Sequence, residues 1–252
     1  MNRYLPAEWH PQEAIQLTWP HSGTDWAETL EEVTRCYIGM AREIALRQKL
    51  WIVTPQPQRV RALLEGELPG KALANIEYFR IPSNDTWARD HAFITSIDET
   101  NKKLILEDFQ FNGWGLKFAA NHDNQINKST YPSIAAFYQS KGLQTVYKNS
   151  LDFVFEGGSI ESDGEGTLMV TSSCLLSDNR NNAMSQEDID YYLKESFNAE
   201  RVFWIKNSWL AGDDTDGHID TIARFCSPTS IAYVKCDAPH DEHYEGLQAM
   251  EA

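Results

Sequence analysis

The sequence predicts a mixed α/β protein. Segments with apolar residues at helical spacing alternate along the 252-residue chain with short apolar segments typical of buried strands. A hydrophobic fraction of 42%, with 12% aromatic residues, is enough for a sizeable core. The chain shows no low-complexity segment, no linker and no repeat recognisable residue by residue. We therefore expect a single α/β domain over residues 1–252.

The first half of the chain opens with a long amphipathic helix, DWAETLEEVTRCYIGMAREIA, in which Asp25 and Glu28 are placed like a capping box. Later segments show either strand-like apolar runs or helical periodicity. We expect, in order, a strand at 49–54, a helix at 59–68, a strand at 75–81, a strand pair at 91–98 and 103–111 around the turn DETNK, and a helix ending at Gly142.

The second half predicts a hairpin, a helix and a further strand pair. GSIESDGEGTLMVTS reads as a hairpin that turns at DGEG. SQEDIDYYLKESF begins with the capping pair Ser185 and Asp188 and carries one apolar face. We expect RVFWIK to be a strand, and HIDTIARFCSPTSIAYVKC to be two paired strands joined at SPTS.

The charge balance and the cysteines exclude several classes of protein. Thirty-seven acidic against 22 basic residues give a formal charge of −15, which disfavours nucleic acid and anionic membranes as partners. No apolar run approaches the ~20 residues of a membrane span, and MNRYLPAEWHPQEA lacks the apolar core of a secretory signal. The four cysteines form no CxxC pair, so neither a zinc knuckle nor a disulfide framework is expected. A cytoplasmic location is the simplest interpretation.

Four clusters of polar and aromatic residues lie where predicted strands begin or end: NDTWARD (84–90), FNGWGLK (111–117), FEGGSIE (155–161) and DTDGHID (214–220). Each has an ordinary structural explanation when it is taken alone. An aspartate can pair with a neighbouring arginine, a tryptophan can pack in a core, a glutamate before glycines can close a turn, and a lone histidine is often a satisfied buried residue.

Taken together, the clusters fit a site for a planar cation. A guanidinium presents a flat fork of N–H donors that carboxylates match best, and Asp90 and Asp220 would grip it from two directions. On a strand, residues two apart share a face at ~6.6 Å, so His218 and Asp220 would enter the same cavity. A tryptophan face would add a cation–π contact of ~0.5–2 kcal/mol, and His218 can exchange a proton near neutral pH.

Six segments together resemble the agmatine deiminase and bacterial-type peptidylarginine deiminase family: YLPAEWHPQEAIQLTWPH, NDTWARDHAF, FNGWGLK, FEGGSIE, CLLSDNRN and GDDTDGHIDT. They follow one another in the family's order from residue 4 onward. The resemblance implies a five-fold pseudosymmetric α/β propeller of ββαβ-type modules. It also implies hydrolysis of a guanidinium C–N bond, as in the conversion of agmatine to N-carbamoylputrescine and ammonia for putrescine and polyamine metabolism.

The resemblance also implies roles for particular residues. By match, Asp90 and Asp220 hold the guanidinium, His218 transfers protons, and Glu156 belongs to the active-site acids. The candidate substrate-binding residues are Trp87 as a wall against the apolar stem, Trp114, and Asp214 as a reader of a distal amine. The expected partner is a small cationic guanidino substrate, agmatine or arginine-like. A homodimer would suit the resemblance, and no cofactor or metal is expected.

The sequence departs from the family at the nucleophile, a cysteine in a glycine-rich segment near the C-terminus. None of the four cysteines lies in such a motif, so we expect a propeller that stops before its closing module. Activity of these 252 residues is therefore open. Two alternatives are a catalytically inactive relative that binds guanidino or amine ligands, and a ferrous oxygenase in which H-x-D is completed by His240 or His243.

Overall fold

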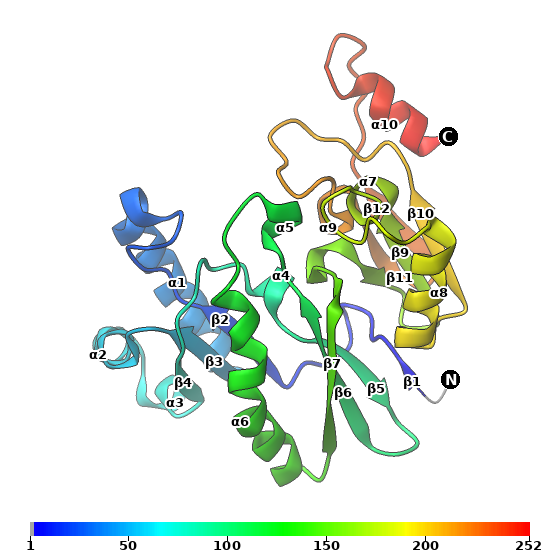
Figure 1. The fold of residues 1–252 in the computed structure, drawn as a ribbon. Helices are drawn as coiled ribbons and strands as arrows, with labels where there is room; N and C mark the ends of the chain where they lie inside the picture. The colour runs from blue at the N-terminus through cyan, green and yellow to red at the C-terminus, as the bar shows by residue number, and fades with distance from the viewer. Residues whose placement is uncertain (1–2) are drawn as a thin grey trace. The chain divides into compact units, whose positions relative to one another are not determined.

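The computed structural model describes residues 3–252, which form the mixed α/β architecture shown in Figure 1. Residue contacts divide the chain into two compact units. The larger unit comprises Met1–His10, Phe93–Ala119 and Ser133–Ala252, and the smaller unit comprises Pro11–Ala92 and Ala120–Pro132. The predicted α/β class is confirmed, while the five-fold propeller and the single domain over 1–252 stay predictions.

The smaller unit is built on a parallel sheet in the order β2-β3-β4, made of Ala14–Thr18, Lys49–Thr54 and Ile76–Arg80. Parallel neighbours require crossover connections, which are supplied by helices α1 (Leu30–Ala45), α2 (Pro57–Glu67) and α3 (Gly70–Leu73). The central strand β3 is the most deeply buried of the three, because it has a neighbour on each side. The unit also holds α4 (Ala88–His91), η2 (Asp123–Gln125) and the start of α6 (Ile126–Ser140).

The capping box predicted at Asp25 and Glu28 is wrong. A 3-10 turn, η1 (Ala27–Thr29), precedes α1, and the residue at the N-terminus of each of these helices makes no side-chain capping bond. The backbone N–H groups of this segment are instead bonded within successive turns, from Ala27 to Thr24 O and from Thr29 to Trp26 O. The helix therefore begins after the turn, at Leu30, and Glu28 lies inside the turn.

The larger unit contains a sheet in the order β1-β5-β6-β7, formed by Arg3–Tyr4, Ile94–Asp98, Lys103–Gln110 and Gln144–Val154. The hairpin predicted around DETNK is confirmed, since β5 and β6 pair antiparallel with Asp98 opposite Lys103. Strands β6 and β7 are parallel. The turn before β7 uses Gly142 at φ +78°, as predicted for the residue that ends a helix.

A second sheet of the larger unit has the order β10-β9-β8, from Arg201–Ile205, Thr167–Thr171 and Glu161–Ser162. The predicted hairpin between β8 and β9 is confirmed. Helix α8 (Gln186–Phe197) opens with the predicted capping box, in which Ser185 and Asp188 bond reciprocally. Its buried face joins a core whose fully enclosed side chains include Phe153, Phe155, Leu175, Leu193 and Phe197.

The strand predicted to begin at His218 is wrong over its first five residues. Residues Ile219–Ile222 form the helical turn α9, with His218 as its N-cap at φ −53° and ψ 140°, and strand β11 begins only at Ala223. Thr221 closes the turn by donating from its N–H and its hydroxyl to His218 O, at 3.2 and 2.8 Å. The strand spacing expected between His218 and Asp220 does not apply. Beyond this turn lie the predicted pair β11 (Ala223–Ser227) and β12 (Ser230–Tyr233), and helix α10 (Tyr244–Glu251).

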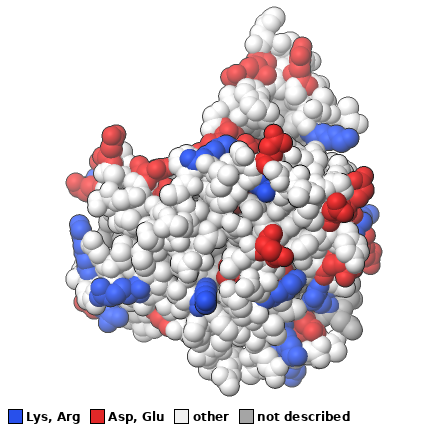
Figure 2. Space-filling view, viewed as in Figure 1, with Lys and Arg blue, Asp and Glu red and all other residues white. Residues whose placement is uncertain are grey.

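Among residues 3–252, no helix combines the length and the apolar character needed to cross a membrane. On the face shown in Figure 2, acidic and basic side chains both occur, separated by broad uncharged areas. The formal charge of −15 is therefore not gathered into one patch on that face.

Candidate active site

A carboxylate and an imidazole meet in the interior of the larger unit. Glu156 follows β7 and leads into the short turn η3 (Gly157–Ser159), while His218 leads into α9, and these two turns pack against each other. Nε2 of His218 lies 3.7 Å from Oε2 of Glu156. Glu156 is fully buried and His218 is only 2% exposed. The pair therefore interacts with little screening by water.

Arg180 supplies the positive charge that a buried carboxylate needs. It follows α7 (Ser172–Leu175), and its Nε donates to both oxygens of Glu156, at 3.1 and 3.0 Å. Burial alone would raise the pKa of Glu156, but its interaction with His218 and the charge of Arg180 hold that pKa below its ordinary value. Glu156 is therefore a carboxylate at neutral pH.

All three nitrogens of the Arg180 guanidinium have partners. Besides Glu156, it donates to Asp216 Oδ2 at 2.6 Å, to Ser177 Oγ at 2.8 Å and to Thr215 O at 3.0 Å. Burial alone would lower the pKa of Arg180, but the acidic groups around it raise that pKa above its ordinary value. Arg180 is thus a permanent buried cation that joins Glu156 to the acidic loop of residues 212–217.

Lys117 extends this arrangement outward. Its Nζ lies 2.6 Å from Asp216 Oδ1 and 2.5 Å from Asp214 O. Partial burial would raise the pKa of Asp216, but hydrogen bonds from Lys117 and Arg180 hold it below its ordinary value. The order is therefore Lys117, Asp216, Arg180, Glu156 and His218, and the charges alternate from Lys117 at the half-exposed end inward to Glu156.

The acidic loop is shaped by Asp213. One of its carboxylate oxygens accepts from Thr215 N at 3.0 Å, and the other accepts from Gly217 N at 2.6 Å. Gly217 has φ +82°, and a Cβ there would lie 2.8 Å from Ser208 O and Oγ and from Ser173 Oγ. Only glycine fits this position without displacing a neighbour. Asp214, the predicted reader of a distal amine, is exposed at the tip of the loop.

Trp114 lies in a left-handed turn, α5 (Gly113–Leu116), in which all four residues have φ between +56° and +79°. Asn112 closes the turn by accepting Gly115 N at 2.8 Å. Trp114 is only 7% exposed and packs edge-on against Phe111 and Phe118. These contacts favour a packing role in which Trp114 fixes the loop that presents Lys117.

Cys174 lies beside the buried pair, with Sγ 3.9 Å from Glu156 Oε2. Donor atoms of Cys174, Glu156 and His218 all fall within 4.8 Å of one another, and such a donor set can hold zinc. However, burial raises the pKa of the Cys174 thiol, and Arg180 already engages both oxygens of Glu156. We therefore describe the three groups as a buried polar cluster and assign no metal to them.

Asp220 and the two predicted residues of the smaller unit lie on short helical turns. Asp220 is half-buried on α9. Asp90 is buried within α4, and Trp87 precedes that helix, 41% exposed and with its ring 5.8 Å from that of Trp26. Residues 84–86 precede Trp87, and Asn84 donates its backbone N–H to Asp123 Oδ1 at 2.8 Å. The roles of all the predicted site residues stay predictions.

The histidines named for a ferrous site lie in the C-terminal segment. In His243, Nδ1 is 2.7 Å from Asp241 Oδ1 and Nε2 accepts Ala211 N at 2.9 Å, while the ring stacks on Trp209. Both nitrogens of His243 therefore have a partner, which disfavours this residue as an iron ligand. His240 is exposed.

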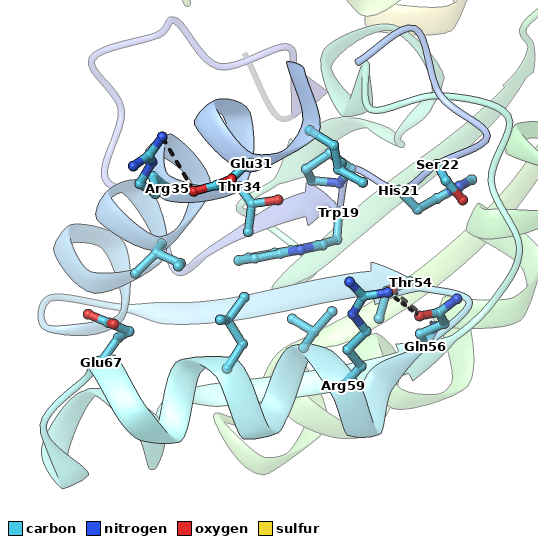
Figure 3. Close-up of a pocket in the computed structure, with 15 residues that line it drawn as sticks. Trp19, His21, Ser22, Glu31, Thr34, Arg35, Thr54, Gln56, Arg59 and Glu67 are labelled. Carbon is cyan, nitrogen blue, oxygen red and sulfur yellow. Dashed lines mark hydrogen bonds and ion pairs between the residues drawn. The ribbon is translucent and has the colours of Figure 1, made fainter. Parts of the chain in front are cut away.

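A separate cavity of about 720 Å³ occurs in the smaller unit, between α1 and α2 (Figure 3). The ring of Trp19 lies between the two helices, Arg35 and Glu31 pair on one wall, and Arg59 contacts Gln56 on the other. None of the predicted site residues lines this cavity.

Sequence reasoning missed the central part of the buried network. Arg180 lies in CLLSDNRN, which carries only the resemblance to the family, and Lys117 lies in the predicted cluster FNGWGLK, but the sequence assigns a role to neither residue. Arg180 stands 24 residues from Glu156 and 36 from Asp216 along the chain. The only available signal was an arginine in an otherwise neutral or acidic loop, SDNRNN.

Comparisons with known proteins identify the family. The model of the Porphyromonas-type peptidyl-arginine deiminases matches residues 4–252. A curated relative from Legionella pneumophila (strain Paris), provisionally named an agmatine deiminase, is 34% identical over 97% of this chain and 66% of its own length. The chain thus spans slightly less than two thirds of that relative.

Two solved structures are also similar. One from Porphyromonas gingivalis, provisionally described as an arginine deiminase, is 46% identical with a TM-score of 0.85, over 99% of this chain and 70% of that one. The other is a Cys-to-Ser variant of the C. jejuni agmatine deiminase with substrate bound, 36% identical with a TM-score of 0.84, over 99% of this chain and 69% of that one. This chain belongs to the Porphyromonas-type peptidyl-arginine deiminase family.

Proposed function

We propose that the chain forms the guanidinium-binding and proton-transferring part of a hydrolase that converts agmatine, or a similar guanidine, to the ureido compound and ammonia. Membership of the family and the names of the similar agmatine deiminases support this reaction class. The observation that carries the proposal is the buried Glu156–His218 pair, in which the carboxylate is held ionised beside an imidazole. Such a pair suits proton transfer near neutral pH.

In this proposal two carboxylates hold the substrate. Asp90 and Asp220 accept hydrogen bonds from the two NH₂ edges of the guanidinium, which fixes the plane of its central carbon. Trp87 offers an exposed aromatic face for the apolar stem or for a cation–π contact. Asp214, exposed on the acidic loop, would meet a distal amine.

The chemistry requires a nucleophile and one water molecule. A cysteine thiolate adds to the guanidinium carbon, the C–N bond to one NH₂ group breaks, and protonated His218 gives its proton to the departing ammonia. His218 then takes a proton from water and hydroxide adds to the same carbon. The C–S bond breaks to release the thiolate, and the O–H proton passes to ammonia as the ureido carbonyl forms. The net change consumes one water and produces one ammonium.

The thiolate in this scheme follows from the family resemblance, and one similar protein was solved with substrate as a Cys-to-Ser variant. Cys174 does not fit that role, because it is fully buried and its pKa is raised, which keeps the thiol protonated and unreactive. The unreactive thiol of Cys174 favours a second candidate function, in which these residues bind a guanidino ligand without converting it.

Two measurements on the same preparation separate these functions. Isothermal titration calorimetry with agmatine reports binding, and an ammonia assay reports turnover. We expect agmatine to bind and putrescine, which lacks the guanidinium, to bind at least tenfold more weakly. Binding with ammonia release supports the hydrolase, binding without release supports the ligand-binding relative, and no binding of agmatine would overturn both.

A further inference from the structure

The surroundings of Glu156 show which group can carry a proton in this site. Its carboxylate is faced by three ionisable side chains: His218, Arg180 and Cys174. Only Arg180 among them is permanently charged, since its pKa is raised and the thiol of Cys174 is neutral. A carboxylate with no exposed surface depends on such a fixed cation to remain ionised.

The geometry points to Arg180 as a positioning residue for the proposed reaction: it fixes Glu156 as a permanent anion beside His218 and ties both to the acidic loop through Asp216. This inference rests on the proposed function and deepens it. His218 is then the group that moves the proton, and Glu156 orients the ring and supports its cationic form without itself titrating.

The shape of the guanidinium makes this role specific to arginine. Nε engages Glu156 on one edge while the two terminal nitrogens engage Asp216, Ser177 and Thr215 on the other. A lysine ammonium is a point charge on a flexible stem and cannot bridge carboxylates on opposite sides with fixed geometry. Lysine at this position would keep the charge but lose the connection between Glu156 and the loop.

The neighbouring backbone is built around this bridge. A Cβ at Gly115, in the left-handed turn, would lie 3.3 Å from a terminal nitrogen of Arg180 and 3.4 Å from Asp216 Oδ2. The turn therefore packs directly on the Arg180–Asp216 pair and brings Lys117 to the outer oxygen of Asp216. Arg180 is only 7% exposed, and the turn beside it limits the movement of its charged group.

The test reads the ionisation of Glu156 in the ligand-free chain. Protein labelled with ¹³C at the glutamate carboxyl carbons is titrated by NMR, and Glu156→Gln identifies the signal. We expect the wild-type signal to stay at the carboxylate position from about pH 5 to about pH 9, whereas in Arg180→Met it titrates inside that window, as buried glutamates without a permanently charged partner do. Arg201→Met, at an exposed arginine of the same unit, is the matched control and leaves the signal unchanged.

Arg180→Lys separates the charge from the geometry. We expect this variant to keep Glu156 ionised but to weaken agmatine binding at least tenfold. A Glu156 signal that stays ionised in folded Arg180→Met would overturn the inference, and so would agmatine affinity in Arg180→Lys that equals the wild-type value.

A folding defect in Arg180→Met is informative too. If an unpaired Glu156 carboxylate causes it, adding Glu156→Gln restores the melting temperature. If the double variant is as unstable as Arg180→Met, Arg180 acts only by packing and the inference fails. The NMR titration needs no substrate, so a wild-type chain that does not bind agmatine would count against the proposed function alone.

Discussion

Nε2 of His218 lies 3.7 Å from Oε2 of Glu156, and the two residues reach each other from turns 62 positions apart in the chain. Both are removed from solvent, so their interaction depends on how accurately two backbone turns place them. We therefore expect substitutions that change the backbone turns or the buried ionisable groups to have measurable effects.

Gly217→Ala should displace His218. A Cβ at Gly217 would come within 2.8 Å of the Ser208 backbone oxygen, and φ +82° is unfavourable for alanine. Gly212 provides the control, because it has φ +80° but nothing within 4 Å of a Cβ. We expect Gly212→Ala to cost about 1 kcal/mol of unfolding free energy, and Gly217→Ala about 2–4 kcal/mol, since overpacking adds to the backbone term. Urea denaturation measures both, and equal costs would refute the steric argument.

Asp123→Asn should change how stability depends on pH. Burial raises the pKa of Asp123 from 3.8 to about 6. A carboxyl whose pKa is higher in the folded state contributes stability that is present below pH 3.8 and lost as the pH rises through about 6. The loss is at most about 3 kcal/mol. We expect wild type to lose stability relative to Asp123→Asn between about pH 4 and pH 7. Unfolding curves that stay parallel across this range would contradict the assignment.

Cys174 should resist alkylation in the folded chain. Its thiol is buried and its pKa is raised, so little reactive thiolate exists at mildly alkaline pH. Cys36 and Cys226 are exposed and serve as internal controls. Treatment with iodoacetamide followed by mass spectrometry should show modification of these two cysteines within minutes, and of Cys174 only after denaturation. Rapid labelling of Cys174 in native protein would mean that the thiol is activated after all.

Ser185→Ala should destabilise helix α8 by about 1 kcal/mol. Ser185 Oγ accepts a hydrogen bond from Asp188 N at 3.2 Å, and Asp188 Oδ2 accepts one from Ser185 N at 2.9 Å. Thr29→Ala is a matched control, because Thr29 precedes α1 without making a side-chain capping bond. We expect the control to change the melting temperature less than Ser185→Ala does, and an equal change would contradict the capping argument.

These cases also show how far the sequence could predict the structure. Local patterns were reliable where one short-range rule dominated, as at the Ser185–Asp188 capping box, the Asp98–Lys103 hairpin and the turn at Gly142. The strand expected at His218 failed because Gly217 turns the chain with a positive φ and the apolar residues Ile219 and Ile222 have helical spacing over a single turn.

The candidate site was predictable only in part. Glu156 and His218 were expected to serve one site, and the structure brings them together. The bridge through Arg180 could not be read from the sequence, because it joins segments that are distant along the chain and depends on the fixed shape of one side chain. Trp114 was expected to face a ligand, but its burial between two phenylalanines favours packing.

Calorimetric titration of wild type, Asp220→Asn and Asp237→Asn with agmatine tests the central proposal most directly. Asp237 is the control, because it is exposed and pairs with Lys235. We predict that agmatine binds to wild type and to Asp237→Asn with equal affinity, and that binding to Asp220→Asn is lost while its circular dichroism spectrum is unchanged. Unaltered agmatine affinity in Asp220→Asn would contradict the account of a guanidinium held by carboxylates.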